Sequence, residues 1–110
     1  IVKLDSFGSI VWQKSLGGSG FDYARSIQQT SDGGYIVAGG NGGADYWIVK
    51  LDSFGSIVWQ KSLGGSGNDG ATSIQQTSDG GYIVAGYSTS IDGDVTGNHG
   101  GYDSWIVKLQ

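Results

Sequence analysis

Short apolar stretches, each bounded by glycine, aspartate or serine, recur along the whole chain. Between residues 24 and 63 they predict four strands, at Ala24–Ser31, Tyr35–Gly39, Asp45–Leu51 and Ser56–Leu63. β-Branched and aromatic residues dominate these stretches, as is typical of strands. The stretches are too short for helices and lack apolar residues at every third and fourth position. The pattern therefore predicts an all-β protein.

Turn signals join these strands closely. The link Ser31–Gly34 contains an Asp-Gly pair, which is a strong hairpin signal because glycine accepts a positive φ. Asp52–Gly55 has similar turn chemistry between the third and fourth strands. Tyr35–Ala38 is apolar at every position, as in a strand that is buried between two layers. We therefore expect four-stranded antiparallel meanders stacked face to face.

The chain is an internal repeat with an offset of 47 residues. Ile1–Gly40 and Ile48–Tyr87 match at 36 of 40 positions. Setting aside Ser88–Asn98 as an 11-residue insertion, Asn41–Leu51 matches His99–Leu109 at 8 of 11 positions. We divide the chain into repeats 1–47 and 48–105, with 106–110 starting a third. Four-stranded repeats of about 40 to 50 residues are typical of β-propeller blades, which predicts about two blades per chain.

Several motifs resemble a known family. Asp32–Gly40 reads DGGYIVAGG, Asp45–Asp52 reads DYWIVKLD, and Ile57–Trp59 follows. These segments resemble kelch repeats, and more closely the tandem WIVKLD and DGGYIVAG repeats of bacterial and archaeal cell-surface propellers. Tyr87 departs from the kelch glycine pair. The resemblance implies an extracellular or cell-surface location and a scaffolding or ligand-binding role. It also implies inner strands Ala24–Ser31 and Ala71–Ser78, and outer strands Ser9–Leu16 and Ser56–Leu63.

Two blades cannot close a ring, because a propeller needs about 4 to 8. The chain opens with third- and fourth-type strands, Ile1–Leu4 and Ser9–Leu16, and its last strand, Tyr102–Leu109, is of the third type. We expect roughly three or four copies to complete one another's split blade and close about six or eight blades. Ile1–Leu4 and Trp105–Leu109 then compete for one position. Four tryptophans are expected to pack between blades: Trp12, Trp47, Trp59 and Trp105.

The composition argues against several classes of partner and site. The net charge is −4 and no stretch concentrates the basic residues, so nucleic acid and anionic membranes are poor partners. Cysteine is absent, which excludes disulfides and thiolate metal sites. No apolar run approaches the roughly 20 residues of a membrane span. Glycine supplies 22 of 110 residues and proline none, so folding needs dense packing or many backbone hydrogen bonds.

The insertion leads into a segment with the spacing of a twelve-residue calcium loop. Oxygen-bearing side chains stand at places one, three, five and twelve, which are Asp92, Asp94, Thr96 and Asp103. Place twelve is an aspartate instead of the longer glutamate, and its counterpart Asp45 occurs in the repeat without the insertion. These features favour a solvated, glycine-rich connector. We therefore expect no cofactor, and keep calcium as the one ion that this segment could bind.

A second candidate site lies where the repeats differ. Phe21, Tyr23 and Arg25 of the first repeat correspond to asparagine, glycine and threonine in the second. An aromatic and arginine cluster on one propeller face could hold a glycan or a peptide. Sequence drift is the favoured explanation of these differences. The nearby aspartates Asp22 and Asp69 are expected to cap backbone N–H groups.

Catalysis has little support in the sequence. His99 is the only histidine, and glutamate is absent. No second histidine or cysteine can complete a metal site or nucleophile pair. An active site at a ring centre, built from Arg25, Gln28 and Gln75 of several copies, stays an open alternative. We expect a non-catalytic structural or interaction propeller that assembles into a ring, with a glycan- or small-ligand-binding, lectin-like propeller as the alternative.

Overall fold

The computed structural model of the protein describes residues 1–18, 20–42 and 44–110. This part of the chain contains nine strands and no helix, which confirms the all-β prediction. The strands are β1 Val2–Leu4, β2 Ile10–Gln13, β3 Tyr23–Gln29, β4 Tyr35–Gly40, β5 Tyr46–Leu51, β6 Ile57–Leu63, β7 Asp69–Gln76, β8 Tyr82–Ser88 and β9 Asp103–Leu109.

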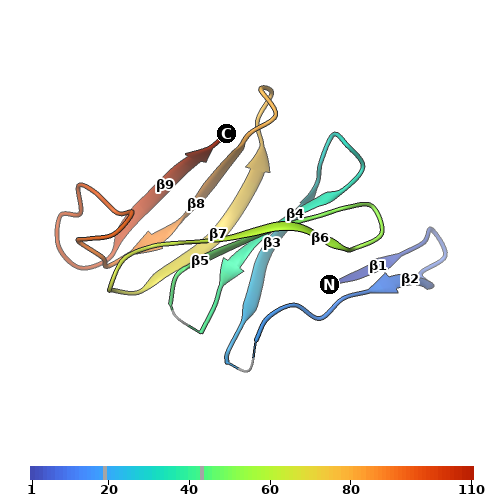
Figure 1. Cartoon of the computed structure of the whole chain (residues 1–110), viewed down its shortest axis with the longest axis horizontal. Helices are drawn as coiled ribbons and strands as arrows, with labels where there is room; N and C mark the ends of the chain where they lie inside the picture. The colour runs from blue at the N-terminus through green and yellow to red at the C-terminus, as the bar shows by residue number, and fades with distance from the viewer. Residues whose placement is uncertain (19, 43) are drawn as a thin grey trace.

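The strands form three antiparallel sheets (Figure 1). The N-terminal hairpin contains β1 and β2, the middle sheet has the order β3-β4-β5-β6, and the C-terminal sheet has the order β7-β8-β9. Within each sheet, strands that follow one another in sequence pair, so the middle and C-terminal sheets are meanders. Strand β7 lies against β3, β4 and β5, so the middle and C-terminal sheets pack together.

The strand ends lie close to the predicted ones, with one larger difference. The sequence predicts a strand over Ser9–Leu16, whereas β2 covers only Ile10–Gln13. Its partner β1 is three residues long and offers few backbone groups to pair with. Strand β6 contains the same Ile-Val-Trp-Gln-Lys-Ser-Leu sequence and extends over Ile57–Leu63, because the longer β5 pairs with it. The length of the partner strand therefore decides the outcome for identical sequences.

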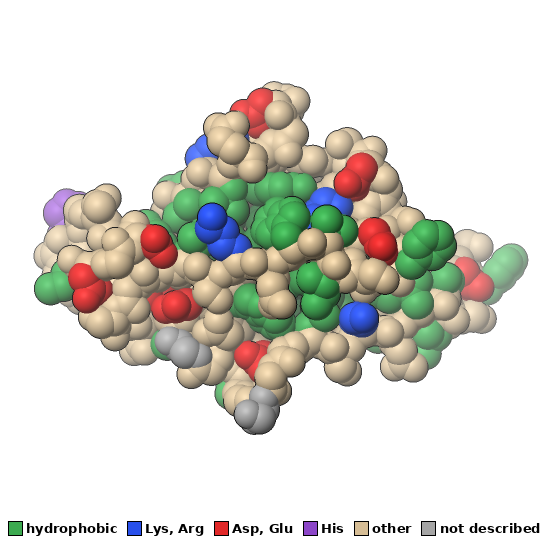
Figure 2. All heavy atoms as spheres, in the orientation of Figure 1, with side chains coloured by type: hydrophobic (Ala, Val, Ile, Leu, Met, Phe, Trp, Pro, Cys, Tyr) green, Lys and Arg blue, Asp and Glu red, His purple; other side chains and the backbone are tan. Residues whose placement is uncertain are grey.

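The main core lies between the middle and C-terminal sheets. Ile36, Ile48 and Tyr46 from the middle sheet and Val84 from β8 are all 0% exposed, and Ile74 of β7 joins them. Burial of such side chains stabilises a fold by about 1.5–3 kcal/mol each. The apolar residues that Figure 2 shows on one face gather across its middle and at the end formed by the hairpin. Some apolar surface therefore remains uncovered.

A smaller core lies between the middle sheet and the N-terminal hairpin. Val37, Val49 and Leu51 of the middle sheet are buried there, and Ile1 and Leu16 pack against them. Trp12 of the hairpin contacts Tyr35 edge to face, with ring centres 5.7 Å apart.

The four tryptophans lie half-buried at contacts between sheets. Trp59 of β6 meets Tyr82 of β8 at 5.9 Å, which repeats the contact that Trp12 makes with Tyr35. Trp105 lies 4.6 Å from Tyr46, whose hydroxyl donates a hydrogen bond to the Trp105 carbonyl oxygen. Trp47 packs against the smaller core.

Candidate functional site

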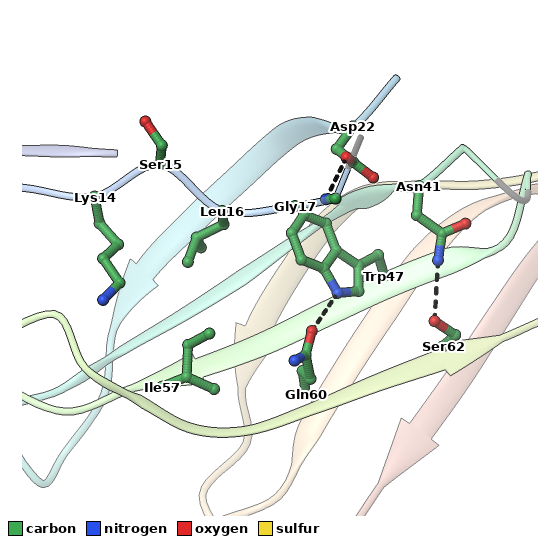
Figure 3. Close-up of a pocket in the computed structure, with 11 residues that line it drawn as sticks. Lys14, Ser15, Leu16, Gly17, Asp22, Asn41, Trp47, Ile57, Gln60 and Ser62 are labelled. Atoms are coloured by element: carbon green, nitrogen blue, oxygen red, sulfur yellow. Dashed lines mark hydrogen bonds between the residues drawn. The ribbon is translucent and has the colours of Figure 1, made fainter. Parts of the chain in front are cut away.

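A hollow of about 450 Å³ opens between the link from β2 to β3 and strands β5 and β6 (Figure 3). The Trp47 indole donates a hydrogen bond to Gln60 Oε1 over 3.0 Å, and Asn41 donates one to Ser62 Oγ over 3.0 Å. The lining is mixed, since Lys14 stands beside the apolar Leu16 and Ile57. Such a surface suits polar ligands better than purely apolar ones.

The insertion docks on the corresponding link of the second repeat. Asp94 Oδ2 accepts a hydrogen bond from the Gly64 N–H over 3.0 Å, and Asp92 Oδ1 accepts one from the Ser66 N–H over 2.7 Å. Ser90 is 1% exposed and Val95 is 4% exposed. The insertion is therefore not a fully solvated connector, as the sequence suggested, because its carboxylates satisfy backbone N–H groups of the link.

The four candidate calcium ligands separate into two places. Asp92 and Asp94 face the link, whereas Asp103 Oδ2 accepts a hydrogen bond from the His99 N–H over 2.7 Å and lies 2.9 Å from His99 Nδ1. Thr96 lines a separate hollow of about 240 Å³ that Asp103 also borders. Within residues 1–18, 20–42 and 44–110, no three acidic or histidine side chains form a group that could hold a metal. Calcium binding stays an open alternative to the expected absence of a cofactor.

The linker aspartates make the capping bonds that the sequence predicts. Asp22 Oδ2 accepts a hydrogen bond from the Gly18 N–H over 2.9 Å, and Asp69 Oδ2 accepts one from the Gly65 N–H over 3.1 Å. Asp69 is 2% exposed and also accepts hydrogen bonds from the Ser88 and Ser90 hydroxyls. This buried carboxylate therefore ties the link, the end of β8 and the insertion together.

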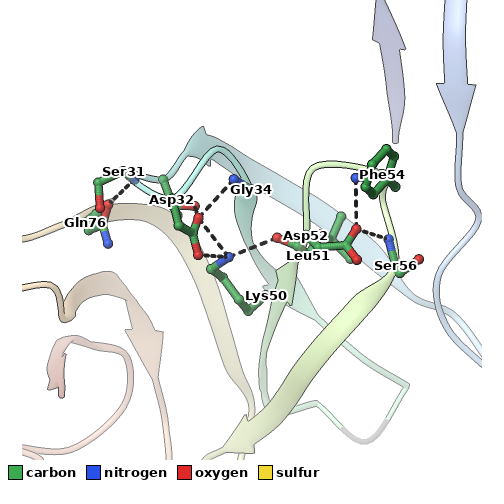
Figure 4. Close-up of polar contacts among 10 residues, drawn as sticks. Ser31, Asp32, Gly34, Lys50, Leu51, Asp52, Phe54, Ser56 and Gln76 are labelled. Carbon is green, nitrogen blue, oxygen red and sulfur yellow. Dashed lines mark hydrogen bonds and ion pairs between the residues drawn. The ribbon is translucent and has the colours of Figure 1, made fainter.

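Turn aspartates are likewise engaged in local structure (Figure 4). Asp32 Oδ1 accepts hydrogen bonds from the Thr30 hydroxyl and from the Gly34 N–H, and Asp32 Oδ2 lies 3.1 Å from Lys50 Nζ. These contacts, the Thr30 bond foremost, hold the pKa of Asp32 well below its usual range. Asp52 accepts bonds from two backbone N–H groups of its own turn. Both carboxylates therefore stabilise their turns, and the lowered pKa makes Asp32 a poor proton acceptor.

The three predicted ligand-binding residues lie together. The rings of Phe21 and Tyr23 have centres 6.1 Å apart, and Arg25 Cζ stands 5.0 Å from the centre of the Tyr23 ring. The Tyr23 hydroxyl hydrogen-bonds with that of Tyr87 in the C-terminal sheet, and this bond, followed by burial, raises the pKa of Tyr23. Tyr87 in turn contacts Tyr102 at 5.6 Å. We call Phe21, Tyr23, Tyr87 and Tyr102 the aromatic row.

Glycines opposite the two central tyrosines make room for the row. Tyr23 pairs with Gly40 across β3 and β4, and Gly70 pairs with Tyr87 across β7 and β8. A Cβ atom on either glycine would collide with the hydroxyl of the opposite tyrosine. The Tyr-Gly pair is thus exchanged between strands from one repeat to the next.

Sequence reasoning missed Tyr87 and Tyr102 as members of this site. A signal was present, because Tyr87 is one of the four positions that differ between Ile1–Gly40 and Ile48–Tyr87. Tyr102 likewise replaces Ala44 of the first repeat. Only the packing of the middle sheet against the C-terminal sheet brings these differences to Tyr23.

The residues considered for a catalytic centre are not assembled within one chain. Gln28 Oε1 accepts a hydrogen bond from the Gln76 N–H over 2.8 Å, which links β3 to β7. Gln75 and Arg25 are exposed. His99 is exposed and has Asp103 as its partner. An active site shared between copies stays an open alternative.

Comparison of the sequence with models of known protein families gives no match, and comparison with curated proteins gives none either. Among the described residues, no helix is long and apolar enough to cross a membrane. The kelch-like resemblance therefore stays a prediction that rests on the motifs themselves.

Proposed function

We propose that this chain is a non-catalytic interaction propeller that assembles with copies of itself into a closed ring. One observation carries the proposal: equivalent residues of the repeat are buried between sheets in one place and exposed in another. Ile48 of β5 is 0% exposed, whereas its counterpart Ile106 of β9 is 64% exposed. The outer face of the C-terminal sheet, which contains Ile106, is thus apolar like the face around Ile48, but no sheet of the described residues covers it.

The opposite face of the middle sheet has the complementary property. Ile74 of β7 is 5% exposed, whereas its counterpart Ile27 of β3 is 49% exposed. Ile48 and Ile74 belong to one buried cluster. If the Ile106 face of one copy packed on the Ile27 face of the next, the contact would repeat the packing between the middle and C-terminal sheets that buries Ile48 and Ile74. Such head-to-tail contacts close into a ring when the rotation between copies allows it.

Strand β9 also offers a partner for a fourth strand. It lies at the edge of its sheet, and an unpaired edge readily accepts another strand. Residues Ile10–Gln13 of β2 have the same sequence as Ile57–Gln60, which pair with β5. Strands β1, β5 and β9 share the Val-Lys-Leu segment, so β2 of one copy can pair with β9 of another after leaving β1. Roughly three or four copies would then close about six or eight blades.

Mass measurement of the native protein tests the assembly. We expect multiples of the chain mass for the wild type, and a shift to the monomer for Ile106→Glu and for Ile27→Glu. Both side chains are exposed in the single chain, so neither charge should unfold it. The control is Ile91→Glu, since Ile91 is 79% exposed and belongs to the insertion, which docks on the link between β6 and β7. A wild type that stays monomeric at all concentrations would contradict the proposal.

A cross-link tests the exchange of strands separately. The pairing of Val49 with Gln60 in the middle sheet predicts that Val107 of one copy pairs with Gln13 of another. Cross-strand Cβ atoms lie about 4.5–5.5 Å apart, close to the distance that a disulfide bridges. The double variant Gln13→Cys/Val107→Cys should form covalent oligomers on oxidation. Native cysteines cannot form a competing disulfide, because the wild-type sequence has none. If oligomers form but no cross-link appears, the copies associate by packing of their faces, and the exchange of β2 is excluded.

A further inference from the structure

The positions at which the repeats differ gather at one place in the structure. Phe21, Tyr23, Arg25 and Tyr87 each belong to one of the four differing pairs between Ile1–Gly40 and Ile48–Tyr87. Ring contacts of 6.1 Å and 5.6 Å, together with the hydrogen bond between the Tyr23 and Tyr87 hydroxyls, join the aromatic row from Phe21 to Tyr102. Scattered drift would not place all four differences between these two segments in one patch.

Packing explains the middle of the aromatic row but not its ends. Tyr23 and Tyr87 are half-buried over glycines and join two sheets. Phe21 is 81% exposed and Tyr102 is 68% exposed, so neither adds much to the core. Their rings extend the row over the surface and offer flat apolar faces next to phenol hydroxyls.

Arg25 supplies a positive charge beside these rings. It is the only arginine in the sequence, and it is exposed. Its guanidinium stands over the Tyr23 ring and makes no ion pair with any described carboxylate. An arginine fork recognises a carboxylate through two parallel hydrogen bonds. The stacked guanidinium is therefore available to an anionic group of a ligand.

We propose that the aromatic row and Arg25 bind an acidic saccharide, with the sugar rings on Phe21 and Tyr102 and a carboxylate on Arg25. Apolar C–H faces of a sugar ring stack on aromatic rings, and the phenol hydroxyls can exchange hydrogen bonds with sugar hydroxyls. Single-stranded nucleic acid would also use rings and an arginine. The net charge of −4 opposes a long polyanion such as a nucleic acid strand, which favours a short acidic oligosaccharide.

This site does not depend on ring assembly. The counterparts of Phe21 and Arg25 in the C-terminal sheet are Asn68 and Thr72. Both remain exposed although the middle sheet packs against that sheet. A neighbouring copy that packed on the middle sheet in the same way would leave Phe21 and Arg25 accessible. Failure of saccharide binding and failure of assembly are therefore separate results.

Calorimetric titration with an oligogalacturonate, beside a neutral oligogalactose of the same length, tests the proposal. We expect the acidic sugar to bind more tightly, and Phe21→Ala to weaken its binding roughly tenfold or more. Arg25→Thr, which installs the residue of the second repeat, should remove the preference for the acidic sugar. Arg25→Lys should restore only part of it, because lysine cannot form the paired hydrogen bonds.

The matched control is Phe54→Ala, because Phe54 is also 81% exposed but lies in the turn after β5. Its binding should equal that of the wild type. Equal binding of Phe21→Ala and the wild type would overturn the proposal, as would no binding of the acidic sugar. Tighter binding of a single-stranded oligonucleotide than of oligogalacturonate would also overturn it, in favour of a nucleic acid ligand.

Discussion

Asp45 and Asp103 occupy the same position in the two repeats, yet the structure shifts their pKa values in opposite directions. Burial, followed by the charges of Asp69 and Asp94, raises the pKa of Asp45. Hydrogen bonds from the backbone N–H and side chain of His99 lower the pKa of Asp103. The insertion contributes to both effects, because it supplies Asp94, the smallest of the three causes, to one site and leads into His99 at the other.

Replacement of Asp45 should therefore stabilise the protein at neutral pH. A raised folded-state pKa means that the folded protein favours the protonated acid. That contribution is complete below the unfolded pKa of about 3.9 and is lost as the pH rises through the raised value. Asp45→Asn should raise Tm at pH 7 and have little effect near pH 3, measured by thermal melts across that range.

Asp103→Asn is the matched control for this experiment. Because its folded pKa is lowered, the Asp103 carboxylate stabilises the fold above the unfolded pKa, and this stability is lost as the pH falls through the lowered value. The variant should lower Tm at pH 7. Shifts of the same sign in both variants would show that burial and the neighbouring charges do not govern the effect of Asp45 on stability.

The two linker aspartates should differ in their effect on stability. Asp69→Ala leaves the Ser88 and Ser90 hydroxyls and the Gly65 N–H without their shared acceptor in a buried place. We expect a loss of about 2–4 kcal/mol in the free energy of unfolding. Asp22→Ala removes a single exposed bond and should cost about 1 kcal/mol or less. Urea denaturation of both variants measures the difference, and equal losses would refute a special role for Asp69.

Trp59 should contribute less than a fully buried tryptophan, because it is half-buried against Tyr82. We expect Trp59→Ala to cost about 2–3 kcal/mol, from lost packing and the lost edge-to-face contact. Phe7→Ala is the control, since Phe7 is 92% exposed and should change stability by no more than about 0.5 kcal/mol. A Trp59 loss as small as that of Phe7 would place the indole outside the packed contact.

Calcium should leave the melting temperature unchanged relative to a chelator control. Backbone hydrogen bonds hold Asp92 and Asp94 toward the link, whereas Asp103 is held by His99, so the four candidate ligands do not converge on one ion. Asp92→Ala should loosen the insertion with or without calcium, because the Ser66 N–H then loses its acceptor. A rise in Tm with millimolar calcium that Asp92→Ala abolishes would instead assign Asp92 as a ligand.

The sequence predicts the strands and turns well because their causes are local. The Asp-Gly turn at Asp32–Gly33 needs only its own side chains and a glycine at φ +85°. Strand β2 is the exception, since its length depends on β1 and not on its own residues.

The candidate site was harder to predict, because its contacts join distant segments. Phe21, Tyr23 and Arg25 are close in sequence and were identified together. Tyr87 reaches Tyr23 only through the packing of two sheets. The insertion has a metal-like spacing of acidic residues, but spacing alone does not indicate that Asp92 and Asp94 turn toward the link at Gly64 and Ser66.

The exchanged pairs Tyr23/Gly40 and Gly70/Tyr87 also constrain how the duplication diverged. If both repeats began with the same pair, two substitutions were needed, and each order passes through a different intermediate. Tyrosine at both positions puts a side chain where the opposite ring already lies, as the collision at either glycine shows. Glycine at both positions leaves only an empty space beside the strand. The substitution of tyrosine by glycine therefore came before the substitution of the opposite glycine by tyrosine. Neither substitution is neutral without its partner.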